Sequence, residues 1–207
     1  MYNTFGMHLR SELLQLTDFH DKTKRPIFLS GITCSGKTTI GQIVAANLGT
    51  QLVPEFSSPI PRWVMNTRKD HSFQRCIEAQ QWTLLQHQRK NEHILSSDLT
   101  IVDRYWPDTL LYSVLYGDKV FSAVESLLTR YAWISGKYFI LYSEDYVIKE
   151  RLKQKLRLSE QQWLKQWYAF IHDLSQATLE LAAMGGFRLI DTSSVSIEDA
   201  AAQIIDS

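Results

Sequence analysis

The stretch GITCSGKTT, residues 31–39, decides the fold of this chain. It fits the pattern GxxxxGK[ST] without a mismatch, follows the short apolar run PIFLS, and opens a segment of helical composition that ends near Gly49. In this pattern the glycines let backbone N–H groups curl around an anion, and the helix N-terminus adds partial positive charge. The sequence therefore predicts a phosphate-binding loop between a buried strand and a helix.

The side chains of this loop point to a bound nucleotide. Lys37 would reach the β- and γ-phosphates, and the Thr38 hydroxyl would ligate Mg²⁺. The alternative is a glycine-bearing turn that binds nothing. We expect the nucleotide to contact Gly31, Ser35, Gly36, Lys37, Thr38 and Thr39.

Apolar runs and helical patterns alternate along the chain, which is typical of a parallel α/β sheet. Strands are expected at 26–31, 51–56, 99–103, 137–143 and 187–193. Helices are expected at 36–48, about 72–95, from Pro107, around 119–131, at 159–184 and after a cap at Ser196. We predict an α/β, three-layer P-loop fold: a five-stranded parallel sheet flanked by helices, with a short basic lid. Residues 25–207 would form this domain, and residues 1–24 an N-terminal extension with a short amphipathic helix.

Composition excludes several classes of protein. Lys and Arg total 22 and so do Asp and Glu, so no basic patch predicts a nucleic-acid or membrane partner. The two cysteines suggest no disulfide framework, and the six histidines show no metal-ligand spacing. No apolar run approaches the ~20 residues of a membrane span, and the N-terminal residues lack the apolar core of a signal peptide. We expect a cytoplasmic protein of one main domain.

The third predicted strand ends in Asp103 and Arg104, within IVDRY. Open α/β sheets bind ligands at the carboxyl ends of their strands, beside the phosphate loop in this case. We interpret Asp103 as a second Mg²⁺ ligand with Thr38, and Arg104 as a clamp for a phosphate or a sugar hydroxyl. Two alternatives are open: Asp103 could pair with Arg104 or cap a helix, and Arg104 could pair with a neighbouring acid.

The motifs narrow the class of P-loop protein. The chain has no base-reading N-K-x-D, which Ras-like GTPases would show. Its third strand ends in Asp-Arg, whereas ATPases of the AAA or transporter type usually carry paired acids there. GKTT at 36–39, VPEF at 53–56, SFQ at 72–74 and DRYWPDTLLYS at 103–113 resemble the thymidylate kinase and deoxynucleoside kinase group. Its members' R-E-P-G-G-T and D-R-F-E motifs have no counterpart. PEF and IEAQQW also resemble nicotinamide-riboside-kinase-like domains.

The resemblance implies a kinase that uses ATP and Mg²⁺ and takes a nucleoside or nucleotide as its small-molecule acceptor; a homodimer is open. It places Glu55 where deoxynucleoside kinases carry a catalytic Glu, which would act as a base toward a hydroxyl acceptor. A monophosphate acceptor needs no base but needs extra cations. Three arginines lie in the right region for that role: Arg62, Arg68 and Arg75.

Two further groups of residues could complete the site. The basic segment KERLKQKLR, 149–157, would form the lid, with Arg151 and Arg157 as catalytic cations; the alternative is a solvated helix face. A base-reading slot could comprise Trp63, Phe73, Gln74, Gln81 and Tyr105, although aromatics at helical spacing more often belong to a core. The alternative to a kinase is a non-catalytic nucleotide-binding module that docks on a partner through residues 1–24.

Overall fold

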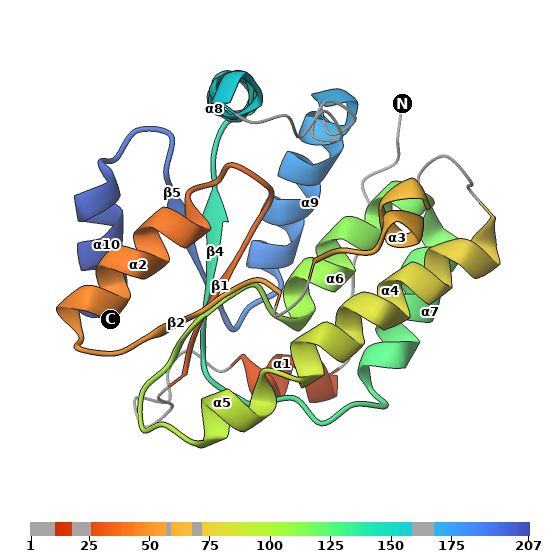
Figure 1. The fold of residues 1–207 in the computed structure, drawn as a ribbon, viewed down its shortest axis with the longest axis horizontal. Coiled ribbons are helices and arrows are strands. Elements are labelled where there is room, and N and C mark those ends of the chain that lie inside the picture. Colours follow the sequence, from red (N-terminus) through yellow and green to blue (C-terminus); the bar gives the residue numbers. More distant parts are fainter. Residues whose placement is uncertain (1–10, 18–25, 57–58, 68–71, 159–167) are drawn as a thin grey trace.

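A five-stranded parallel sheet forms the centre of the computed structural model, which describes residues 11–17, 26–56, 59–67, 72–158 and 168–207. The strand order is β2-β3-β1-β4-β5, with β1 in the middle (Figure 1). The strands are β1 Ile27–Ser30, β2 Leu52–Val53, β3 Ile101–Asp103, β4 Lys137–Tyr142 and β5 Phe187–Asp191. The predicted sheet is confirmed.

Helices cover both faces of the sheet. On one face, α2 (Lys37–Asn47) and α10 (Ile197–Ile205) share an apolar core with β1 and β4. On the other face lie α4 (Phe73–Gln88), α6 (Trp106–Ser113), α7 (Asp118–Leu128) and α9 (Ile171–Ala183) (Figure 1). The smaller elements are α3 Arg62–Asn66, α5 Asn91–Leu95, a 3₁₀ turn at Val114–Tyr116 and α8 Asp145–Leu158. The three-layer α/β prediction is therefore confirmed.

The central strand β1 is buried on both faces, which explains why its sequence is a continuous apolar run. Its Phe28 packs in one core and its Leu29 in the other, and both are fully buried. Leu29 lies in register with Asp103 of β3 and with Phe139 of β4. The carboxyl ends of β1 and β3 therefore finish side by side, where the phosphate loop begins.

Two predicted elements are shorter in the structure. The strand predicted at 51–56 is only β2, because Pro54 has no N–H to continue the ladder. Glu55 consequently lies in the loop after β2. The helix predicted at 72–95 is divided into α4 and α5. The predicted helix at 159–184 begins outside the described residues, and α9 forms its second half.

Helix α1, Ser11–Leu16, packs against the amino ends of the strands, on the side opposite α8 (Figure 1). Leu13 is buried in the larger core, and Thr17 after the helix is fully buried. The N–H of Gly136, just before β4, donates to the carbonyl of Leu16 at 3.2 Å. Residues 11–17, which the sequence assigned to an extension, thus pack on the P-loop domain. None of the described helices is long and apolar enough to cross a membrane.

Gly186 tests this packing, because a Cβ there would collide with Thr17, including its carbonyl oxygen at 2.7 Å. Gly185 is the matched control: both glycines have positive φ, 87° and 71°, but a Cβ at Gly185 meets nothing within 4 Å. We expect Gly186→Ala to lower the free energy of unfolding by ~1–3 kcal/mol more than Gly185→Ala. Urea denaturation measures the difference, and equal effects would contradict the packing of α1.

Candidate active site

The loop between β1 and α2 is shaped by three residues with positive φ: Gly31 at 137°, Cys34 at 63° and Gly36 at 96°. Two features require glycine at position 31. Its φ is positive, and a Cβ there would collide with the carbonyl oxygen of Leu141 on β4. The loop therefore lies against β4, and it leads into α2 as the phosphate-loop pattern predicts. The predicted loop between a buried strand and a helix is thus present, between β1 and α2.

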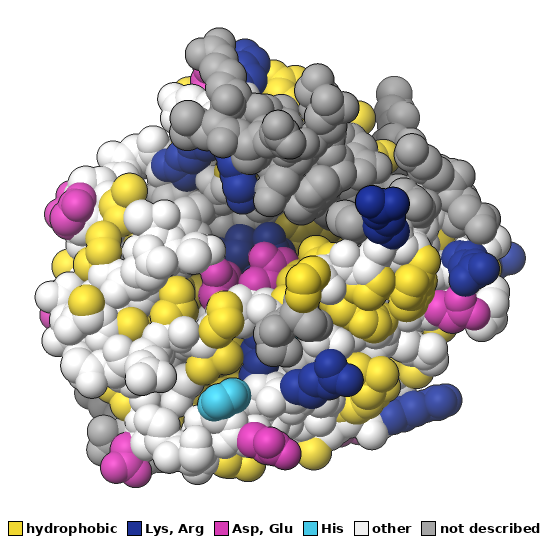
Figure 2. Space-filling model, in the orientation of Figure 1, with side chains coloured by type: hydrophobic (Ala, Val, Ile, Leu, Met, Phe, Trp, Pro, Cys, Tyr) yellow, Lys and Arg dark blue, Asp and Glu magenta, His cyan; other side chains and the backbone are white. Residues whose placement is uncertain are grey.

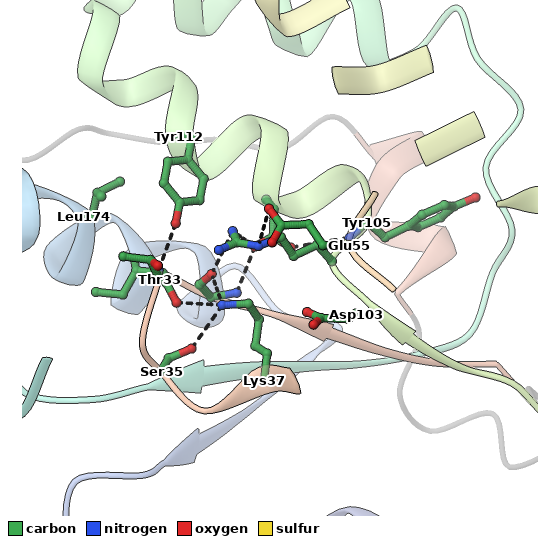
Figure 3. Close-up of polar contacts among 12 residues, drawn as sticks. Thr33, Ser35, Lys37, Glu55, Asp103, Tyr105, Tyr112 and Leu174 are labelled. Atoms are coloured by element: carbon green, nitrogen blue, oxygen red, sulfur yellow. Dashed lines mark hydrogen bonds and ion pairs between the residues drawn. The ribbon is translucent and has the colours of Figure 1, made fainter. Parts of the chain in front are cut away.

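Lys37 folds back into the loop (Figure 3). Its ammonium donates to the carbonyls of Gly31 at 2.8 Å and Ile32 at 2.6 Å, and to Ser35 Oγ at 3.3 Å. Burial, together with nearby Arg104, lowers the pKa of Lys37 to about 8. The ammonium is thus held at the concave side of the loop, where a phosphate could replace the carbonyls as its partner.

Thr38 and Asp103 meet across the ends of two strands. The Thr38 hydroxyl donates to Asp103 Oδ2 at 2.5 Å, while Asp103 Oδ1 is buried without a hydrogen-bond partner. A hydroxyl and a carboxylate are hard oxygen ligands, and Mg²⁺ typically takes few protein ligands plus phosphates and water. Among the described residues no group of three or more His, Cys, Asp or Glu could hold a metal. The pair fits Mg²⁺ held jointly with a nucleotide.

Arg104 follows with φ of 61°, and its side chain turns away from Asp103 toward other acids. Its Nε lies 2.9 Å from Glu55 Oε1, and its Nη1 lies 3.0 Å from Asp108 Oδ1. The guanidinium also stacks over the Tyr112 ring at 5.1 Å. Of the alternatives left open by the sequence, Arg104 pairs with acids other than Asp103.

Asp108 was not predicted as a site residue, yet it joins the phosphate loop to the end of β3. It is buried, and its Oδ1 accepts from the N–H of Gly31 at 3.2 Å as well as from Arg104. Burial raises the pKa of Asp108, and the Arg104 charge opposes this. One turn later, the Tyr112 hydroxyl accepts from the N–H of Thr33 at 2.9 Å. Asp108 and Tyr112 follow Arg104 by four and eight residues, which places them on one face of a helix. This spacing could have identified them as partners of Arg104 from the sequence.

Arg151, predicted as a lid cation, is tied to three segments of backbone. It donates to the carbonyl of Cys34 at 3.3 Å, to Ser143 Oγ at 3.1 Å, and to the hydroxyl and carbonyl of Thr192 at 3.2 and 2.7 Å. The Thr192 hydroxyl in turn donates to the carbonyl of Ser35 at 3.1 Å. Arg151 therefore links the phosphate loop to the ends of β4 and β5 at the base of α8.

A cavity of about 510 Å³ is lined by Lys37, Glu55 and Arg104. Other residues of the loop and the start of α2, among them Thr38 and Thr39, also line it. The remaining walls are Arg151, Gln154 and Lys155 of α8 and Thr192, Val195, Ser196 and Ile197 after β5. Figure 2 shows basic and acidic side chains side by side in the hollow at the centre of this face. The cavity is large enough for a small-molecule ligand.

None of the five residues of the predicted base-reading slot lines the cavity. Tyr105 is fully buried, stacks on Phe28 at 4.6 Å, and points away from Lys37 and Glu55 (Figure 3). The prediction that Tyr105 contacts the substrate is wrong for this structure, because its ring belongs to the core. Trp106 is equally buried.

The other predicted acceptor residues lie outside the cavity. Trp63 and Phe73 are exposed, Gln81 is half-buried, and Gln74 bonds with Glu78 at 3.1 Å. Among the predicted arginines, Arg62 is exposed and Arg75 pairs with Glu78 at 3.3 Å. Arg68 and the side chain of Arg157 lie outside the part of the chain that is described. The roles of these residues stay predictions.

Comparison with known proteins agrees with this architecture. A family model described as an AAA domain matches residues 26–193, although the third strand ends in Asp-Arg and not in the paired acids expected of AAA-type ATPases. No curated protein matches. Deoxyadenosine kinase from M. mycoides, solved with dCMP and dCDP, shares 14% identity and a TM-score of 0.65, over 87% of this chain and 97% of that one.

Two thymidylate kinases superpose similarly. The Candida albicans protein has 16% identity and a TM-score of 0.67, over 89% of this chain and 90% of that one. The Ehrlichia chaffeensis protein has 14% identity and a TM-score of 0.57, over 89% and 97%. At these identities the likeness shows a shared fold, which confirms the fold expected from the sequence resemblance.

The pKa of Lys37 gives a pH dependence for nucleotide binding. Bound phosphates would raise this pKa above its free value of about 8. The ammonium's contribution to affinity is therefore complete below pH 8 and is lost as pH rises above it, by up to about tenfold per pH unit. Titration calorimetry with a non-hydrolysable ATP analogue between pH 7 and 9.5 measures it. Lys37→Met should bind weakly at every pH, and a flat wild-type profile would contradict the assignment.

Proposed function

The chain belongs to the AAA-domain family, and we propose that within it this protein is a P-loop kinase that transfers the γ-phosphate of Mg-ATP to a nucleoside or a nucleotide. The observation that carries the proposal is the Glu55–Arg104 pair, 2.9 Å apart, which lines the same cavity as Lys37 and Thr38. A phosphate cradle with a carboxylate across one cavity is what transfer to an acceptor needs.

The donor side is supported by the loop. Its N–H groups would surround the phosphates of ATP, with Lys37 on the β- and γ-phosphates. Thr38 and Asp103 would hold Mg²⁺, which when bound supplies positive charge to the phosphate oxygens. The buried, unpartnered Oδ1 of Asp103 favours this arrangement, because an ionised buried oxygen without a donor calls for a cation.

The acceptor side favours a hydroxyl, and hence a nucleoside, over a monophosphate. The Glu55 side chain is 40% exposed, so it can accept the proton of an acceptor hydroxyl while Arg104 holds its other side. The charge of Arg104 is already balanced by Glu55 and Asp108. An acceptor phosphate beside Glu55 and Arg104 would therefore meet more negative than unpaired positive charge. Another small hydroxyl acceptor, such as nicotinamide riboside, fits the same chemistry.

The proposed transfer conserves atoms and charge in one displacement. The acceptor oxygen forms a bond to the γ-phosphorus, and the bond from that phosphorus to the bridging oxygen of ADP breaks. The hydroxyl proton passes to Glu55. Lys37 and the N–H groups of the loop stay on the phosphates, where charge redistributes toward ADP.

A non-catalytic module that docks through residues 1–24 is less well supported. Residues 11–17 of that segment pack on the domain, with Leu13 in its core. The buried side of this segment is therefore not available to dock on a partner. The balanced charge of the chain favours a small-molecule acceptor over a nucleic-acid or membrane partner. A cytoplasmic location is part of the proposal and is supported by the absence of a disulfide framework among the two cysteines.

Glu55→Gln tests the proposal and its acceptor class together. With a nucleoside acceptor we expect kcat to fall by about 10²–10⁴-fold, because the amide cannot take the proton, while the Kd of an ATP analogue changes less than about threefold. Glu78→Gln is the control, a carboxylate on α4 paired with Arg75 outside the cavity. ADP formation is measured against a panel of nucleosides and monophosphates.

Three outcomes separate the readings. Unchanged activity of Glu55→Gln with a nucleoside would remove Glu55 as the base. Transfer to a monophosphate that survives the substitution would move the acceptor class to nucleotides. No acceptor-dependent ADP formation by the wild-type protein across the panel would sink the kinase proposal.

A further inference from the structure

The turn after β3 presents both halves of the proposed site from consecutive residues. Asp103 meets Thr38, and Arg104 meets Glu55. This requires Arg104 to adopt φ of 61°, a left-handed conformation that costs energy for a residue other than glycine. Such a conformation persists only where its surroundings hold it, so the contacts around this turn determine the geometry of the site.

Lys90 holds the backbone of this turn. Its ammonium donates to the carbonyl of Asp103 at 2.7 Å and to the carbonyl of Arg104 at 2.7 Å. These are the two carbonyls on either side of the Arg104 N–H and Cα, so their positions fix the left-handed conformation.

The burial of Lys90 is unusual for a lysine. The residue is 4% exposed, and within the described part of the chain its ammonium forms no ion pair with a carboxylate. Burial lowers its pKa to about 8, which reflects the cost of placing this charge there. The two carbonyl bonds offset that cost, and both belong to the turn that carries the proposed magnesium and acceptor residues.

The position of Lys90 in the fold explains its reach. It lies in the break between α4 and α5, and helix α4 also supports the opposite side of the Glu55–Arg104 pair. Phe56, next to Glu55, packs on two rings of α4: Trp82 at a centroid distance of 5.5 Å and His87 at 6.2 Å. The C-terminal end of α4 therefore contacts the segments on both sides of the pair.

We propose that Lys90 is a positioning residue of the phosphotransfer site, which holds the Asp103–Arg104 turn so that Asp103 faces Thr38 and Arg104 faces Glu55. This inference rests on the proposed kinase function. Without Lys90, Arg104 can relax toward an ordinary backbone conformation, which moves both side chains at once. The described side-chain hydrogen bonds of Lys90 go to the turn, and Lys37 keeps its own bonds within the phosphate loop, so ATP should still bind while transfer slows.

Lys90→Met tests the inference, with Arg89→Met as its matched control. Arg89 is the preceding residue in the same break, is exposed, and bonds with Gln86 at 3.4 Å, so its substitution removes a charge without touching the turn. We expect Lys90→Met to lower kcat by about 10–100-fold with the KM for the acceptor within about threefold, since displacements near 1 Å suffice for such losses. Lys90→Arg, which keeps the charge and the donors, should recover at least about tenfold of that loss.

A second readout needs no phosphotransfer. The affinity of a non-hydrolysable ATP analogue is measured with and without Mg²⁺, and the ratio reports how well Asp103 is placed. We expect Lys90→Met to reduce the Mg²⁺ enhancement by about fivefold or more and Arg89→Met to leave it unchanged. If the wild-type protein binds Mg²⁺ and the analogue but transfers to no acceptor, the kinase proposal fails and this ratio alone decides the role of Lys90.

Thermal unfolding separates positioning from general stability. All assays run well below the melting temperature of the least stable variant, so that every variant is folded. If Lys90→Met then matches Arg89→Met in kcat and in the Mg²⁺ ratio, Lys90 is structural only and the inference is wrong. If Lys90→Met does not fold, Lys90→Gln, which is uncharged and one bond shorter, takes its place under the same criteria.

Discussion

The buried carboxylate of Asp108 is the contact on which the site depends. It accepts from the N–H of Gly31 and from Arg104, and so joins the start of the phosphate loop to the turn after β3. Arg104 is four residues before Asp108, whereas Gly31 lies in a distant part of the sequence. Burying the Gly31 N–H or the Arg104 guanidinium without a partner would cost free energy. Because one carboxylate serves both, the loop that would hold the donor and the turn that would face the acceptor are positioned relative to each other.

Several lysine and arginine side chains line the cavity, although the chain has zero formal net charge. Lys37 is held by loop carbonyls, Arg151 by carbonyls and hydroxyls, and Arg104 by two carboxylates. These three cationic side chains thus have protein partners before any phosphate arrives. A phosphate would have to replace the carbonyl partners of Lys37, whereas Arg104 and Arg151 can keep theirs. Recognition here is local, which agrees with the absence of an overall basic charge.

Sequence reasoning found what local patterns encode. The phosphate loop, the parallel sheet and the meeting of Asp103 with Thr38 follow from a motif, a periodicity and the rule that strand ends bind ligands. It missed Lys90 and Asp108, because their contacts join segments far apart and neither residue type is distinctive there. It also placed the Tyr105 ring in the substrate site, whereas the ring lies in the core. The sequence alone does not distinguish an aromatic residue that faces a cavity from one that faces the core.

The two-residue length of β2 has an evolutionary consequence. The donor machinery sits on the central strand β1, where both faces and both edges are packed, so few substitutions there are tolerable. Glu55 instead follows a short edge strand, and its placement depends on side-chain contacts to Arg104 and through Phe56. On the proposed function, changes in that loop and in α4, which packs on Phe56, can therefore alter the choice of acceptor while the phosphate loop stays constant. On the proposed kinase function, we expect proteins with this architecture to differ more in their acceptors than in how they hold the donor.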